Sequence, residues 1–252
     1  MFYSVISILA GCVLFASAAV LPKELGLEIC RWKDPEIQVC MRRAVESALP
    51  KLKDGVPRAG IPKLEPLEVS EMAIDFGNTG PVNLKVKLND VKIYGTTSTK
   101  IPELNLDREK EIVSAKLTSD KIVIKGIQNA DGRLLGMPIK NNGEFEAVLT
   151  DVVSKLKLHF KEVTRKGVKY WNLENMEYDV AKVGGMKLKM GGDSTKGKKP
   201  LEISLDQAFS ESAKELEGIM KPVMIEAIRR HYMLLAQRFL QKIPLSELFP
   251  DK

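Results

Sequence analysis

The most regular feature of the chain is an alternation of apolar and polar residues. From Val82 to Leu88 an apolar side chain stands at every second position, with Asn or Lys between. A period of two predicts a β-strand with one apolar and one wet face. The phase slips at Asn89-Asp90, because the next apolar residue, Val91, is odd-numbered. A slip of one residue indicates a β-bulge, which bends a long strand without ending it.

The same alternation recurs downstream, over 155–161, 175–180 and 186–190. Shorter strands are predicted at 111–118, 121–129, 133–139 and 143–150. Turns are predicted at Asp131-Gly132, Asn142-Gly143, Lys166-Gly167 and Gly184-Gly185. No helical pattern interrupts 66–190, so the sheet is expected to be mostly antiparallel with one buried face.

A long helix is predicted after the strands. Ser204-Leu-Asp-Gln207 forms a capping box, and helical spacing of apolar residues then continues to Pro244, with Pro222 as an expected kink. About 38 residues at ~1.5 Å each give roughly 57 Å, which is too long for a compact globule. The predicted fold class is therefore α+β: a highly curved antiparallel sheet wraps the long C-terminal helix and encloses an apolar tunnel.

The beginning of the chain indicates export. Residues 4–20 carry no charge, and small residues then offer a cleavage site after Ala18 or Ala19. We expect a signal peptide over 1–19 and a single secreted, extracellular domain over 20–252; an uncleaved anchor is the alternative.

A short helix and a disulfide are expected near the mature N-terminus. Asp34 as N-cap and Pro35 at the first position predict a helix over 35–49. Cys30 and Cys40 remain after signal removal, and an even pair in a secreted chain predicts one disulfide, with two free thiols as the alternative.

The net charge of +6 comes mainly from lysine, with five lysines in 187–199. A solvated loop and sheet edge is one interpretation, and attraction to an anionic ligand or membrane surface is the other. Nucleic acid is not an expected partner, because few aromatic residues lie between the lysines and the chain is exported.

Catalytic patterns are missing from the sequence. It has two histidines: His159 falls on the wet face of a strand and His231 at the expected rim of the long helix. There is no nucleophile elbow, glycine-rich phosphate loop or metal-ligand spacing. We therefore expect no enzyme activity, catalytic residue, metal or cofactor, although paired acids on distant strands could still meet in space.

Methionine is the positive signal, because its flexible side chain suits adaptable apolar surfaces. Six methionines fall on predicted inward faces, and ordinary core packing is the alternative for each. They are Met176, Met186, Met190, Met220, Met224 and Met233.

Several short motifs carry a resemblance when their order and spacing are read together. They are the Cys30 and Cys40 pair, Gly60-Ile-Pro62-x-Leu-x-Pro66-Leu67, Gly80-Pro81-Val82, Val91-x-Ile93-Tyr94-Gly95, Lys221-Pro222 and Ile243-Pro244-x-x-x-Leu248-Phe249. In these motifs the chain resembles the insect haemolymph juvenile-hormone-binding and takeout family over essentially the whole mature length. The resemblance implies a fold related to the lipid-binding modules of bactericidal/permeability-increasing proteins. It also implies transport of juvenile hormone or another hydrophobic ligand, with the N-terminal helix as a gate.

The leading hypothesis is a secreted monomeric carrier of juvenile hormone or a related terpenoid or lipid. A carrier of another lipid, fatty acyl or isoprenoid, and a defence protein that contacts membrane lipid are the alternatives, and a receptor contact is left open. An esterase is disfavoured by the missing nucleophile set. The candidate ligand-binding residues are Val69, Val86, Leu88, Tyr170, Tyr178, Tyr232, Leu235 and Phe239.

Overall fold

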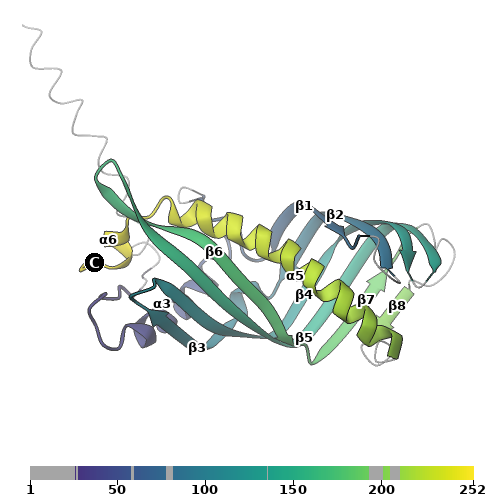
Figure 1. Cartoon of the computed structure of the whole chain (residues 1–252), viewed down its shortest axis with the longest axis horizontal. Helices are drawn as coiled ribbons and strands as arrows, with labels where there is room; N and C mark the ends of the chain where they lie inside the picture. Colours follow the sequence, from purple (N-terminus) through teal and green to yellow (C-terminus); the bar gives the residue numbers. More distant parts are fainter. Residues whose placement is uncertain are drawn as a thin grey trace, which may run out of the picture.

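A single antiparallel sheet curls around one long helix in the computed structural model (Figure 1). The structure describes residues 26, 28–57, 60–77, 82–134, 136–192, 201–204 and 211–252. The strands are β1 (Leu67–Asp75), β2 (Val82–Tyr94), β3 (Lys100–Asp107), β4 (Ile112–Leu134), β5 (Met137–Arg165), β6 (Val168–Lys182), β7 (Gly185–Met190) and β8 (Leu201–Ser204). The helices are α3 (Ile37–Lys51), the 3-10 turn η2 (Thr96–Ser98), α5 (Glu211–Leu240) and α6 (Leu245–Leu248). The predicted α+β class and the helix wrapped by a curved antiparallel sheet are confirmed.

Two long strands, β4 and β5, run through the whole sheet and pair with one another along their length. One end of this pair carries β2 and β1 on one side and β7 and β8 on the other. The other end carries β3 beside β4 and β6 beside β5. The sheet therefore has two halves that share their central strands.

The bulge predicted in the second strand is confirmed. The register between β2 and β4 shifts between Asn89 and Lys92, and Asp90 has a φ of 50°. Asp151 in the middle of β5 has the same positive φ of 50°. A non-glycine residue in this region bends the strand locally and increases its twist, which helps the sheet to curl.

Two of the predicted turns are wrong. Gly132 lies within β4 and Gly143 within β5, so neither glycine ends a strand. A Cβ added at Gly132 would lie 2.0 Å from the Asn83 carbonyl oxygen, and one at Gly143 would lie 2.4 Å from that of Gly191. These glycines allow close approach of neighbouring backbone, which is the other use of glycine in a strand.

The short strands predicted over this region are also wrong in extent. The predicted strands 111–118 and 121–129 are parts of β4, and 143–150 is part of β5. The predicted strand 133–139 is divided between the end of β4 and the start of β5. The turn at Lys166-Gly167 is confirmed between β5 and β6, and Gly184-Gly185 stands where β7 begins.

The long helix is present but begins later than predicted. Ser204 is the last residue of β8, so it does not cap the helix, and 205–210 lie outside the described residues. α5 has 30 residues, with Pro222 inside it. At ~1.5 Å per residue it is about 45 Å long, and it follows the concave side of the sheet (Figure 1).

The predicted N-terminal helix and disulfide are confirmed. The expected helix 35–49 is observed as α3, but it begins two residues later than predicted, with Glu36 and not Asp34 at its N-cap. Asp34 Oδ1 instead accepts a hydrogen bond of 2.8 Å from the Glu36 N–H, before the helix begins. Cys30 and Cys40 are bonded and buried, so the bridge ties the preceding arm to the first turn of α3. The predicted signal peptide, 1–19, lies outside the described residues.

Candidate functional site

The apolar interior contains two separate packed clusters, one in each half of the sheet. The first lies where α3, α6 and the C-terminal part of α5 meet β3, β5 and β6, and includes Trp171 and Leu173. The second lies under the N-terminal part of α5, where Val82 and Leu84 of β2 meet Ile74 of β1. α5 therefore packs near both β1 and β6 and spans the two clusters.

Between these clusters runs a strip of apolar side chains that is incompletely covered. Cross-strand partners share one face of a sheet, and Ala130 of β4 belongs to the cluster under α5. Alternation from Ala130 places the following side chains on the same concave face, where each is half-buried. We call them the central strip: Ile122, Ile124, Phe145, Ala147, Leu149, Met186, Leu188 and Met190.

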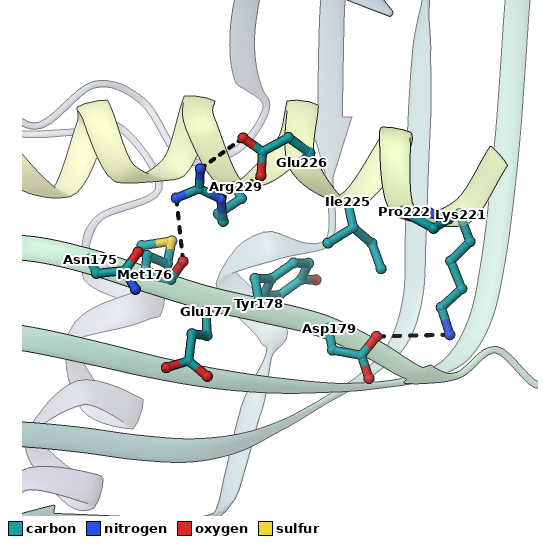
Figure 2. Close-up of a pocket in the computed structure, with 10 residues that line it drawn as sticks. All are labelled: Asn175, Met176, Glu177, Tyr178, Asp179, Lys221, Pro222, Ile225, Glu226 and Arg229. Carbon is teal, nitrogen blue, oxygen red and sulfur yellow. Dashed lines mark hydrogen bonds and ion pairs between the residues drawn. The ribbon is translucent and has the colours of Figure 1, made fainter. Parts of the chain in front are cut away.

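A groove of about 590 Å³ opens between β6 and α5. Figure 2 shows Ile225 pointing from α5 toward β6 and the Tyr178 ring rising from β6 toward α5. The lining is mixed in character: Asn175, Met176, Glu177, Tyr178 and Asp179 from β6, with Lys221, Pro222, Ile225, Glu226 and Arg229 from α5. This groove is open and partly charged, so it is not the enclosed apolar tunnel that the sequence predicts. The enclosed tunnel stays a prediction.

Arg229 is the main ionic anchor of the groove. Its guanidinium donates to both carboxylate oxygens of Glu226, at 2.6 and 2.7 Å, and to the Met176 carbonyl of β6 at 3.5 Å (Figure 2). Arg230 adds a third hydrogen bond, of 2.8 Å, to Glu226. The hydrogen bonds from Arg229 and Arg230 lower the pKa of Glu226 to about 2. About two turns before Arg229 in α5, Lys221 pairs with Asp179 of β6 at 3.8 Å.

Two tyrosines face the same interior. The Tyr178 hydroxyl forms a hydrogen bond of 3.0 Å with Ser154 of β5, and burial raises its pKa. Burial also raises the pKa of Tyr232 on α5, with a further contribution from the charge of Tyr178. Both are candidate residues from the sequence, and the structure brings them together at the edge of the first cluster.

Two nitrogen atoms are buried without a hydrogen-bond partner among the described residues: Gln128 Nε2 on β4 and His231 Nε2 on α5. Gln128 is only 3% exposed. Burial, followed by the charge of Arg238, lowers the pKa of His231, which is half-buried on α5. Sequence reasoning missed Gln128 because a polar residue within a predicted strand, here 121–129, is expected to face solvent.

The other candidate residues are distributed over the molecule. Val69 is buried in β1, while Val86 and Leu88 of β2 are half-buried and pack against the second cluster, as Ile219 and Val223 of α5 also do. Leu235 and Phe239 are half-buried on α5.

Tyr170 is separated from the other candidate tyrosines. It follows the β5–β6 turn on the face of β6 opposite to buried Trp171, and the Arg165 guanidinium lies 5.9 Å from its ring centre.

The methionine prediction holds only in part. Met176 is buried, and Met186, Met190 and Met233 are half-buried. Met224 is 43% exposed, so its predicted inward position is wrong, because it lies on a side of α5 that the sheet does not cover. The Met220 side chain lies outside the described parts.

No group of three or more His, Cys, Asp or Glu in the described ranges has the spacing of a metal site. His159 forms a contact of 2.6 Å with Glu177 across neighbouring strands. No described helix is both long enough and apolar enough to cross a membrane.

The curled sheet with one long helix along its concave side defines the class of protein. The chain belongs to the haemolymph juvenile hormone binding protein family, whose model matches residues 6–250. The crystal structure of takeout 1 from Epiphyas postvittana has the same fold, with a TM-score of 0.67, 22% identity, and coverage of 88% of this chain and 99% of that one.

Two curated relatives are similar in sequence. A putative beta-carotene-binding protein of Schistocerca gregaria is 28% identical over 127 residues, 50% of this chain and 49% of that protein, so the match spans about half of that relative. The circadian clock-controlled protein daywake of Drosophila melanogaster is 21% identical over 230 residues, 88% of this chain and 86% of that protein.

Proposed function

We propose that this protein is a secreted carrier that holds a small hydrophobic ligand between the concave face of its sheet and α5. The observation that supports this proposal is the central strip, in which apolar side chains stay half-buried between two well-packed clusters. Ordinary core packing leaves few voids, so a half-covered apolar strip under a helix favours a second apolar occupant. Family membership supports the same conclusion, and juvenile hormone or a related terpenoid or lipid is the ligand class proposed.

The energetics of such binding follow from apolar burial. Each 100 Å² of ligand surface removed from water contributes roughly 2.5 kcal/mol, before the cost of immobilising the ligand. The hydroxyls of Tyr178 and Tyr232 are available to orient a polar group at one end of the strip. The groove beside Arg229 is the proposed route of entry, because side-chain contacts and not a strand ladder hold α5 against β6 there.

The test is direct recovery and competition. Protein purified from a secreting host as a monomer is extracted with organic solvent for mass spectrometry, and labelled juvenile hormone is competed with fatty acids and isoprenoids. We expect the extract to contain an apolar molecule, or an apolar molecule to compete with the labelled hormone. Acyl chains that compete better than terpenoids would reassign the ligand within the carrier class.

A pair of variants places the ligand. Ile124→Trp fills the central strip and is expected to reduce binding at least tenfold. Ile127→Trp puts the same ring on the opposite face of β4, because the two positions differ by an odd number of residues, and is expected to leave binding unchanged. Equal binding by wild type and Ile124→Trp would contradict this location.

A further inference from the structure

The Gln128 side chain is unusual among the buried groups of this protein. It is 3% exposed, its Nε2 atom is buried, and no hydrogen bond to it is found in the described part of the chain. A primary amide has two donor hydrogens and an acceptor oxygen, and burying it without partners destabilises the folded state. Such a group calls for an explanation beyond packing.

The register of the sheet fixes the direction in which Gln128 points. It pairs with Leu88 of β2 on one side and with Gly143 of β5 on the other. Leu88 packs against the same buried cluster as Ile219 and Val223 of α5, and cross-strand partners share a face. Gln128 therefore stands on the concave face, toward the helix.

Its neighbours along the strands set it at the end of the central strip. Gly126 and then Ile124 follow on the same face of β4, and Phe145 follows Gly143 on β5. The six residue-to-residue steps from Gln128 to Ile122 span about 20 Å of strand at ~3.3 Å per residue. An extended molecule lying on the strip would bring one end to the Gln128 amide.

We propose that Gln128 is a ligand-binding residue that selects apolar molecules with a hydrogen-bond-accepting oxygen at one end, such as an ester or carbonyl. The inference rests on the proposed carrier function, since it assigns the polar contact within that same interior. The unpartnered Nε2–H donates to the ligand oxygen, and the apolar part of the ligand extends along the central strip. The bound ligand then satisfies the group that the protein leaves unpaired.

The experiment compares two probes of similar length, farnesyl acetate and the hydrocarbon farnesene, on wild type and Gln128→Met. Methionine has nearly the shape of glutamine and lacks the amide. Wild type is expected to prefer the acetate, and the variant is expected to lose about tenfold of that preference while it still binds farnesene. Asn129→Met, at the exposed neighbouring position on the other face, is the matched control and should keep the preference.

Thermal unfolding without ligand provides a second readout. If Gln128 is kept for the ligand, Gln128→Met removes an unsatisfied amide and raises Tm by about 2 °C or more. A lower Tm together with an unchanged acetate preference would overturn the inference and assign Gln128 a structural role. If wild type bound neither probe nor any extracted lipid, the carrier function itself would fail; if it bound both equally, only the role of Gln128 would fail.

Discussion

Replacing Lys252 by Met tests how the N-terminal arm is held in the structure. The ammonium group forms an ion pair with Glu111 and lies 3.9 Å from the centre of the Trp32 ring and 5.1 Å from that of Trp171. Only 11% of the Lys252 side chain and 21% of the Glu111 side chain are exposed. The neighbouring Asp251 carboxylate accepts the backbone N–H groups of Trp32 and Lys33, so this segment clamps the arm next to the Cys30 bridge.

The expected loss of stability lies between two limits. Breaking a fully buried pair costs about 3–5 kcal/mol, while an exposed pair contributes about 0–1 kcal/mol. The low exposure places Lys252→Met in between, and the lost cation–π contacts add about 1 kcal/mol, so we expect about 2–4 kcal/mol in all. Lys53→Met is the control: its partner is Asp54 at 3.9 Å, and both side chains are more than half exposed, so the change should cost less than about 0.5 kcal/mol.

Urea unfolding followed by tryptophan fluorescence suits this test, because the two tryptophans of the chain, Trp32 and Trp171, both lie in this cluster. A double-mutant cycle with Glu111→Gln should give a coupling free energy above about 1 kcal/mol. Additive single effects, each below about 0.5 kcal/mol, would refute the argument that the pair is effectively buried.

The pH dependence has a definite sign. Burial acts to raise the pKa of Glu111, but the hydrogen bond and charge of Lys252 outweigh it and hold the pKa below its usual value of 4.5. A lowered folded-state pKa gives stability that is present above pH 4.5 and is lost as the pH falls through the folded-state value. The free energy of unfolding of Lys252→Met should therefore fall less than that of wild type as the pH is lowered below 4.5.

Three other perturbations have expected outcomes. Gly143→Ala should destabilise the protein by more than about 2 kcal/mol, because its Cβ would lie 2.4 Å from the Gly191 carbonyl oxygen. Gly218→Ala, whose Cβ would have no atom within 4 Å, should stabilise α5 by up to about 1 kcal/mol. Similar shifts in Tm for the two variants would contradict this prediction. Glu226→Gln should remove the carboxyl group that titrates near pH 2 in an NMR titration, and a wild-type value near 4.5 would show that the Arg229 contacts do not form in solution. Cys30→Ser opens a bridge with a sequence separation of 10 and should cost roughly 2–3 kcal/mol in chemical denaturation, and an unchanged free energy of unfolding would contradict this expectation.

Local patterns predicted the class of fold because the period of the apolar residues shows whether a segment is a strand or a helix and which of its faces is buried. The slip at Asn89-Asp90 was interpreted correctly as a bulge, and the period of the later residues predicted the long helix. The apolar phase also changes at 119–120, where the pattern predicts a break between two strands, but β4 continues through it. Gly132 and Gly143 look like turn residues in sequence, since nothing local reveals that another backbone passes within van der Waals contact.

The site was less predictable for a related reason. Tyr178 and Tyr232 could be selected because each stands on an apolar face in its own element. The ion pair of Lys221 with Asp179 and the hydrogen bond of Arg229 to the Met176 carbonyl depend on how far α5 is displaced along the sheet, which no periodicity encodes. Gln128 was hidden because a polar residue in a strand is expected to face solvent, and only the register shows that it faces the helix.

The position of α5 has a consequence for how the protein resists aggregation. β6 pairs with β5 on one side, and on its other side the helix supplies donors: Gln237 Nε2 donates to the Leu173 carbonyl at 2.9 Å, and Arg229 donates to that of Met176. Unpaired strand edges are templates for pairing with another chain. Undocking of α5 would therefore expose a ready-made edge, and we expect variants that loosen this helix to form intermolecular β-structure before they lose the rest of the fold.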